Sequence, residues 1–136
     1  MAKVKRIAHI AMLVEGIDRA AAFWHEALGI RPARTEDVLA EGARVAFLPL
    51  GECEVELVQP TTRDSGLARY LERRGPGLHH ICLEVDDIEG MLAQLTRRGV
   101  RLVNEAPQQG AGGRRYAFVH PEATQGVLVE LYEAPG

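Results

Sequence analysis

Residues 9–18 read HIAMLVEGID, and residues 80–89 read HICLEVDDIE. The two stretches match at a constant offset of 71 residues: both open with His-Ile, and both run through a valine and an acidic residue to an isoleucine. Recurrence of a segment at fixed spacing is the sequence signature of a repeated structural unit. We therefore expect the chain to contain two copies of one unit, and this expectation decides the fold.

Both copies continue from this segment in the same way. A helical spacing of apolar residues follows over 17–28 and over 88–98, and each stretch ends near a glycine suited to a left-handed C-cap, Gly29 or Gly99. Two strand-like blocks come later in each copy, at offsets of 71 and 74 residues. Each copy thus reads as a strand, a helix and three strands. The expected elements are 5–14, 17–28, 32–38, 43–50 and 53–59 in the first copy, and 78–86, 88–98, 101–105, 114–120 and 126–133 in the second.

The predicted organisation is a single α+β domain over residues 1–136, in which two tandem βαβββ modules form a curved mixed sheet. A helix is expected between the modules, because apolar residues recur at helical spacing behind a possible N-cap at Asp64 or Ser65. The predicted boundaries are 5–60 for module one, 61–76 for the helical linker and 77–134 for module two.

Composition and charge limit the class of partner. The chain has 136 residues, of which 46% are hydrophobic, and this is enough for one ordinary globular core. Its 16 basic and 19 acidic residues are spread along the sequence and give a net charge of −3, so we expect neither nucleic acid nor a membrane as partner. No signal-type or membrane-spanning apolar stretch is present, and a cytoplasmic location and a small-molecule partner are expected.

A histidine and a glutamate recur at equivalent strand positions in the two copies: His9 matches His80, and Glu56 matches Glu130. A lone strand histidine is more often a core residue than a ligand, and Glu56 alone reads as part of a strand with one wet face. Glu130 differs, because apolar residues flank it and a buried carboxylate is costly unless it is paired or bound to a cation. If the modules pair about a pseudo-twofold axis, the four side chains meet at one point.

This set of side chains predicts a metal site. Two imidazoles and two carboxylates suit a borderline divalent ion such as Co, Ni, Mn, Fe or Zn. In an octahedral field they leave two positions for water or substrate. The predicted ligands are His9, Glu56, His80 and Glu130.

The remaining histidines and the two cysteines are given no direct part in this site. His79 faces the other side of its strand from His80, so we expect it to pack or to support a ligand. His25 and His120 are expected to be structural or on the surface. Cys53 and Cys82 lie in strand-like segments without metal-type spacing, and we interpret them as buried thiols without a functional role.

With the four predicted ligands in view, the chain resembles the vicinal oxygen chelate superfamily, whose members use paired βαβββ modules around one metal. The resemblance covers nearly the whole chain. Several stretches are similar, more narrowly, to the methylmalonyl-CoA epimerase family, and the last three of them are the most specific. They are residues 77–81 (GLHHI), 85–88 (VDDI), 99–101 (GVR), 107–113 (PQQGAGG), 118–121 (FVHP) and 126–131 (GVLVEL).

The resemblance implies a glyoxalase-like fold, a divalent metal with cobalt as the first candidate, an acyl-CoA substrate and a homodimer. The implied reaction interconverts (R)- and (S)-methylmalonyl-CoA by 1,1-proton transfer through a metal-stabilised enolate. It also implies metal binding through His9, His80, Glu130 and the strand position of Glu56, which is glutamine or glutamate in relatives. Glu130 is the implied catalytic base.

The sequence departs from the family pattern at two positions. One subgroup of epimerases carries a second glutamate base where, by alignment on Gly42, this chain has Val45. The second acid/base is therefore open between Glu54, if a strand irregularity turns it inward, and a metal-bound water. The family's usual His-Pro-Lys is His-Pro-Glu here, with Glu122 in the last place.

Two other functions use the same scaffold and remain alternatives. A glyoxalase I-type lactoylglutathione lyase has the same kind of ligand set, so the ligands alone do not separate it from an epimerase. The glycine-rich segment 107–113 and the intervening helix favour the epimerase. The second alternative is a metal-free binding protein of the drug-resistance type, which would need no four-ligand set. An extradiol dioxygenase would need only two histidines and one carboxylate, so the fourth ligand Glu56 argues against that function.

Overall fold

The computed structural model describes residues 1–110 and 113–136. Residues 111–112, which belong to the glycine-rich part of the 107–113 motif, lie outside the described residues. By its contacts the chain divides into two compact units: the N-terminal unit, residues 9–79, and the C-terminal unit, residues 1–8 with 80–136. Strand β1 (Val4–Leu13) contributes to both, because its residues up to Ala8 belong to the C-terminal unit.

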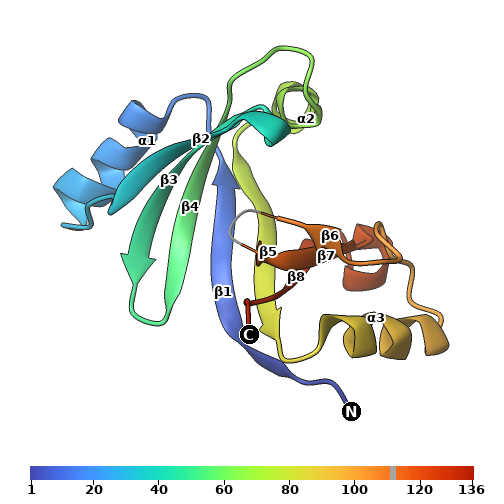
Figure 1. Cartoon of the computed structure of the whole chain (residues 1–136). Helices are drawn as coiled ribbons and strands as arrows, with labels where there is room; N and C mark the ends of the chain where they lie inside the picture. The colour runs from blue at the N-terminus through green and yellow to red at the C-terminus, as the bar shows by residue number, and fades with distance from the viewer. Residues whose placement is uncertain (111–112) are drawn as a thin grey trace. The chain divides into compact units, whose positions relative to one another are not determined.

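The N-terminal unit is a half-sheet with a helix against each face. Its strands β2 (Arg34–Val38), β3 (Ala43–Leu50) and β4 (Cys53–Pro60) lie in the order β2-β3-β4-β1, and only the β4/β1 pairing is parallel. Helix α1 (Ile17–Ala22), which a π-helical turn extends, packs on one face through a core that includes Leu48 and Leu57. Helix α2 (Gly66–Arg74) packs on the other face (Figure 1).

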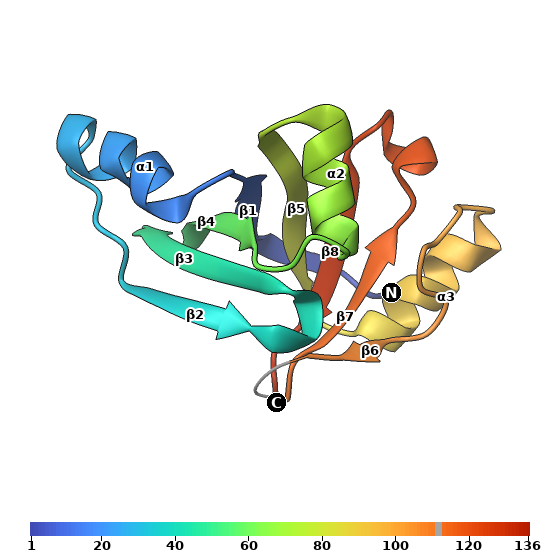
Figure 2. The same cartoon turned by 90° about the horizontal axis from the view of Figure 1, so that it is seen from above.

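The C-terminal unit repeats this strand order. Strands β6 (Gln108–Gln109), β7 (Arg115–Val119) and β8 (Leu128–Glu133) are followed by β5 (Gly77–Val85), and only the β8/β5 pairing is parallel. Helix α3 (Ile88–Arg97) covers one face, where Ile88, Leu92 and Leu131 form the core (Figure 2). The predicted α+β class, with a parallel and antiparallel mixture in each of two repeated modules, is confirmed.

The first helix of each module begins in the same way. The Gln59 side-chain oxygen accepts a hydrogen bond from the Ile17 backbone N–H, and the Glu133 carboxylate accepts one from the Ile88 N–H, both at 3.0 Å. Each of these two side chains lies at the end of the last strand of its own module, so the helix start depends on the finished sheet. Among the described residues, no helix has the length and apolar character needed to cross a membrane.

One predicted element is wrong. The strand expected over 101–105 is reduced to an isolated bridge between Leu102 and Val119, and the short strand β6 pairs with β7 further along the chain. The reason is Asn104, whose side-chain oxygen accepts the Phe118 N–H at 2.8 Å, where a strand would offer a backbone carbonyl. A side chain that replaces a ladder bond ends regular pairing at that point.

A buried carboxylate joins three segments of the C-terminal unit. Glu84 on β5 is 7% exposed and lies 3.1 Å from Lys5 Nζ and 2.9 Å from the Arg6 guanidinium on β1. The Tyr132 hydroxyl on β8 donates to the same carboxylate at 3.2 Å. Burial raises the pKa of Glu84, but the hydrogen bonds from Lys5 and Tyr132 and the charges of Arg6 and Lys5 outweigh it, so its pKa is lowered below 4.5.

We expect Glu84→Gln to reduce the free energy of unfolding by about 1–3 kcal/mol at pH 7, because Lys5, Arg6 and Tyr132 lose a buried charged acceptor. A carboxyl whose pKa is lower in the folded state stabilises above its unfolded value and loses this effect as pH falls through its folded value. The deficit of the variant, measured by urea unfolding, should therefore narrow as the pH falls below 4.5. Glu122→Gln, which removes an exposed ion pair with Arg101, is the control and should leave the unfolding midpoint unchanged. An equal deficit at all pH values would contradict this role of Glu84.

Candidate metal centre

The N-terminal unit brings the first predicted pair together. His9 on β1 and Glu56 on β4 belong to adjacent parallel strands, in which Ala11 is the register partner of Glu56. His9 therefore lies two residues before that position, on the same face. Its Nδ1 is 3.1 Å from Glu56 Oε2, and the two side chains are only 7% and 12% exposed. The sheet face that carries Glu56 is therefore buried at this position. The sequence around Glu56, taken alone, had suggested a solvent-exposed face.

The C-terminal unit brings the second pair together by the same construction. His80 on β5 and Glu130 on β8 belong to adjacent parallel strands, in which Cys82 is the register partner of Glu130. His80 Nε2 is 3.0 Å from Glu130 Oε1, and the side chains are 11% and 10% exposed. The Phe118 ring stands edge-on to the His80 imidazole, 5.6 Å between centroids, and holds it against this face.

The geometry of each pair fits a shared metal ion. Nitrogen and oxygen ligands bind first-row divalent ions at about 2.0–2.2 Å, so two ligands at right angles around one ion lie about 3.0 Å apart. The histidine-to-glutamate distances are 3.1 Å and 3.0 Å. Each pair can therefore bind an ion in neighbouring positions with little movement, and each supplies one imidazole and one carboxylate. The described residues thus fit the metal that the sequence predicts.

The face of the N-terminal unit around Glu56 also carries an arginine and further carboxylates. Phe47 is the register partner of Glu56, and the Arg34 guanidinium lies 3.8 Å from the centre of its ring. Arg34 also lies 2.9 Å from Glu36 and 3.9 Å from Glu54. Glu54 is two residues before Glu56 in a regular strand, so it shares the face of Glu56 without the strand irregularity that the sequence suggested it would need.

Val45 leaves no carboxylate at its position. Its side chain is 5% exposed and belongs to the apolar cluster that α2 covers with Leu67, Tyr70 and Leu71. Its register partner on β2 is Glu36, which is half-exposed and pairs with Arg34. The apolar surroundings of Val45 therefore suit packing between the sheet and α2.

Tyr132 lies on the face of Glu130, two residues further along β8. Burial raises the pKa of its hydroxyl, and the neighbouring Glu84 carboxylate raises it further. Tyr132 is therefore a neutral hydrogen-bond donor at physiological pH. The Arg114 guanidinium lies 4.5 Å from the centre of its ring, which places a cation on this side of the unit.

The other histidines have the structural roles that we expected. The His79 ring stands edge-on to Tyr70 of α2 at 4.9 Å, so it packs. His120 accepts a hydrogen bond from the Glu122 N–H at 3.0 Å and caps the short helix 121–124, and His25 is exposed. The Glu122 side chain, which replaces the family's lysine, pairs with Arg101 at 2.8 Å.

Cys82 is the residue of this region that we missed. Its thiol is fully buried, and its Sγ lies within 4.8 Å of a carboxylate oxygen of Glu130. The signal in the sequence was its spacing from His80, because a residue two places along the same expected strand shares the face of that histidine. The offset of 71 that relates His9 to His80 also relates Ala11 to Cys82. Both positions are register partners of the glutamate in their unit, so the thiol of Cys82, which is buried as predicted, lies beside Glu130.

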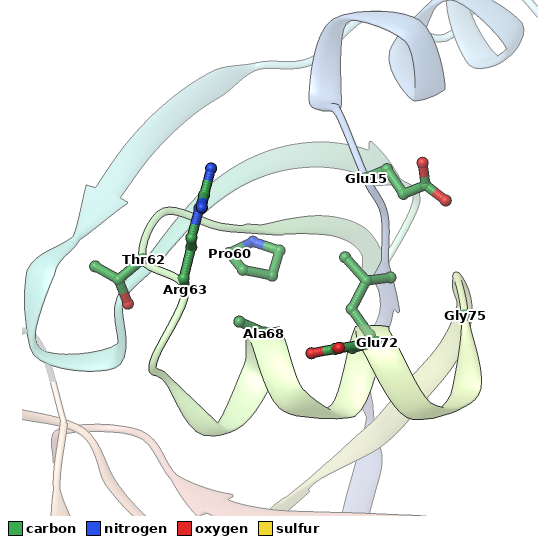
Figure 3. Close-up of a pocket in the computed structure, with 8 residues that line it drawn as sticks. Glu15, Pro60, Thr62, Arg63, Ala68, Glu72 and Gly75 are labelled. Atoms are coloured by element: carbon green, nitrogen blue, oxygen red, sulfur yellow. The ribbon is translucent and has the colours of Figure 1, made fainter.

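A separate pocket of about 500 Å³ opens in the N-terminal unit beside α2 (Figure 3). Its polar lining combines two carboxylates, Glu15 and Glu72, with Arg63 and Thr62. Neither His9 nor Glu56 lines it, so the pocket is distinct from the His–Glu pair of the same unit. The complete lining is Glu15, Pro60, Thr62, Arg63, Ala68, Leu71, Glu72 and Gly75.

Known proteins match both the sequence and the fold. The model of the Glyoxalase/Bleomycin resistance protein/Dioxygenase superfamily matches residues 8–118. The chain is 37% identical to the mitochondrial methylmalonyl-CoA epimerase of Homo sapiens, over 95% of this chain and 74% of that protein. It is 35% identical to the ethylmalonyl-CoA/methylmalonyl-CoA epimerase of Cereibacter sphaeroides, over 94% of this chain and 97% of that protein.

A solved structure supports the same assignment. The structure of a Streptomyces coelicolor methylmalonyl-CoA epimerase variant in complex with 2-nitronate-propionyl-CoA has a TM-score of 0.88 and 30% identity, and covers 98% of this chain and 97% of that chain. The predicted glyoxalase-like fold and the prediction of an epimerase-type enzyme are confirmed by these matches. The chain therefore belongs to the methylmalonyl-CoA epimerase family within the Glyoxalase/Bleomycin resistance protein/Dioxygenase superfamily.

Proposed function

We propose that this chain is a metal-dependent epimerase that interconverts (R)- and (S)-methylmalonyl-CoA by 1,1-proton transfer. The observation that supports it most is the twofold occurrence of a buried His–Glu pair, with 3.1 Å and 3.0 Å between its ligand atoms. The epimerase relatives supply the substrate class: their names include methylmalonyl-CoA, and one solved relative is bound to an acyl-CoA analogue.

The ligands of one divalent ion would be His9, Glu56, His80 and Glu130, with cobalt as the first candidate by family resemblance. When bound, the ion supplies Lewis-acid stabilisation of the enolate charge that develops on the thioester oxygen, an effect typically worth several kcal/mol. The protein's part is to hold two neutral imidazoles and two carboxylates in place, buried from water. Phe118 supports this by fixing the orientation of His80.

Glu130 is the base in this proposal. A carboxylate has two oxygens, so Glu130 can bind the ion through one and accept the C2 proton on the other. The neighbouring Tyr132 hydroxyl donates its hydrogen bond to the Glu84 carboxylate, so these two side chains do not compete with Glu130 for the C2 proton. Epimerisation returns a proton to the opposite face of C2, and Val45 cannot supply it.

Further expectations complete the proposal. The substrate is an acyl-CoA, the enzyme acts in the cytoplasm, and it assembles as a homodimer. A glyoxalase I-type lyase and a metal-free binding protein remain the competing functions. A requirement for metal would exclude the metal-free binding protein. The substrate on which C–H exchange occurs distinguishes the epimerase from the glyoxalase I-type lyase.

We expect protein stripped of metal by a chelator to lose epimerisation and to regain it with Co²⁺ or another borderline divalent ion. Removal of a direct ligand by His80→Ala should weaken Co²⁺ binding, measured by isothermal titration calorimetry, by more than the roughly 10–100-fold typical of lost supporting contacts. His25→Ala removes an exposed histidine and is the matched control, with unchanged affinity expected. Full activity in metal-free protein, or equal Co²⁺ affinity in the two variants, would refute the metal site.

We expect Glu130→Gln to lower kcat for epimerisation by about 10²–10⁴-fold, the usual contribution of a positioned general base, because an amide cannot accept the C2 proton. Glu56→Gln is the matched control from the other module: its amide oxygen still binds an ion, so activity should stay within about tenfold of wild type. Chiral chromatography of the thioester gives the rates, and calorimetry gives metal binding. Similar kcat values for Glu130→Gln and the wild type would remove Glu130 as the base.

A further inference from the structure

The two His–Glu pairs differ at the strand position beside each glutamate. In each unit the residue two places after the histidine is the register partner of the glutamate. In the N-terminal unit this residue is Ala11, which has no ligand atom. In the C-terminal unit it is Cys82. The C-terminal unit therefore has a sulfur atom at a position where the N-terminal unit has only a methyl group.

The sulfur lies close to one predicted ligand of its own unit, Glu130. Cys82 shares its strand face with His80, and its Sγ is within 4.8 Å of a Glu130 carboxylate oxygen. Two ligands of one ion, with bonds of about 2.0–2.3 Å, can lie up to about 4.4 Å apart, so a small side-chain rotation brings sulfur and oxygen to a common ion. The thiol is 0% exposed, which keeps bulk water away from such a bond.

We propose that Cys82 Sγ is a further ligand of the metal in the substrate-free protein and makes the site select thiophilic ions. We rest this on the proposed metal site. Soft thiolate ligands select ions such as zinc, whereas carboxylate ligands suit manganese, so a sulfur ligand increases the preference of the site for zinc over manganese. The sulfur would occupy one of the two positions that the four other ligands leave open in an octahedral field. The thiol would release its proton to solvent when the metal binds, and chelation of a substrate through two oxygens would displace the thiolate, which then takes up a proton again.

The test uses the full-length protein loaded with Co²⁺ in a phosphine reductant, which does not itself supply a thiol. A cobalt–sulfur bond produces an intense near-ultraviolet charge-transfer band, which imidazole and carboxylate ligands do not produce. We expect this band in the wild type and its loss in Cys82→Ala and Cys82→Ser. The control is Cys53→Ala, which removes the other cysteine, whose thiol donates to the Leu50 carbonyl, and should retain the band.

Metal competition provides a second measurement that does not depend on catalysis. Cys82→Ala makes the C-terminal unit equivalent to the N-terminal unit at this position, and we expect it to weaken Zn²⁺ binding about tenfold or more. Mn²⁺ affinity should change by less than about threefold, because manganese prefers oxygen ligands. Thermal unfolding of both Cys82 variants is the check that they are folded at the temperature of the titration.

The outcomes separate this inference from the proposed function. Cobalt bound by the wild type without a charge-transfer band, or equal losses of Zn²⁺ and Mn²⁺ affinity in Cys82→Ala, overturns the sulfur ligand and leaves the four-ligand site intact. A wild-type protein that binds no Co²⁺ overturns both.

Discussion

The cost of burying two carboxylates is the constraint on which the rest of this structure depends. Glu56 and Glu130 are 9% and 8% exposed and stand in strands whose neighbours are apolar. A carboxylate removed from water is unfavourable by several kcal/mol unless hydrogen bonds or a cation compensate for the lost hydration. In both units the compensation comes from a histidine on the adjacent parallel strand. The parallel pairings β1/β4 and β5/β8 are the elements that place each histidine beside its glutamate.

The C-terminal half-sheet divides its two faces between stability and chemistry. In the C-terminal unit, α3 covers one face with an apolar core, and the other face carries His80, Cys82 and Glu84. In the N-terminal unit, α1 covers the face opposite to Glu56, and α2 packs on the apolar part of the face that carries Glu56. Because side chains alternate along a strand, the same strands supply both a core and a polar site without any residue having to serve both. A ligand set built on strands is also more rigid than one built on loops, which suits a metal centre.

The internal repeat explains how much of the fold and of the candidate metal site could be predicted from the sequence. It places each histidine, each glutamate and nearly every strand within a few residues of its position, because equivalent residues in two copies must satisfy the same local geometry. It fails where the copies differ through side-chain hydrogen bonds. Asn104 interrupts the strand expected over 101–105, and no periodicity of apolar residues indicates that an amide will replace a backbone carbonyl. The Glu84 cluster and the proximity of Cys82 to Glu130 depend on strand register, which the sequence does not specify.

We propose that the two His–Glu pairs hold the metal and the base for proton transfer at C2 of a malonyl-type thioester. The most direct measurement is solvent-deuterium incorporation into methylmalonyl-CoA by the metal-loaded protein, followed by mass spectrometry, with a hemithioacetal substrate assayed in parallel. We predict incorporation of deuterium at C2 of methylmalonyl-CoA and no turnover of the hemithioacetal. Turnover of the hemithioacetal without exchange into methylmalonyl-CoA would contradict the claim and identify a glyoxalase-type isomerase instead.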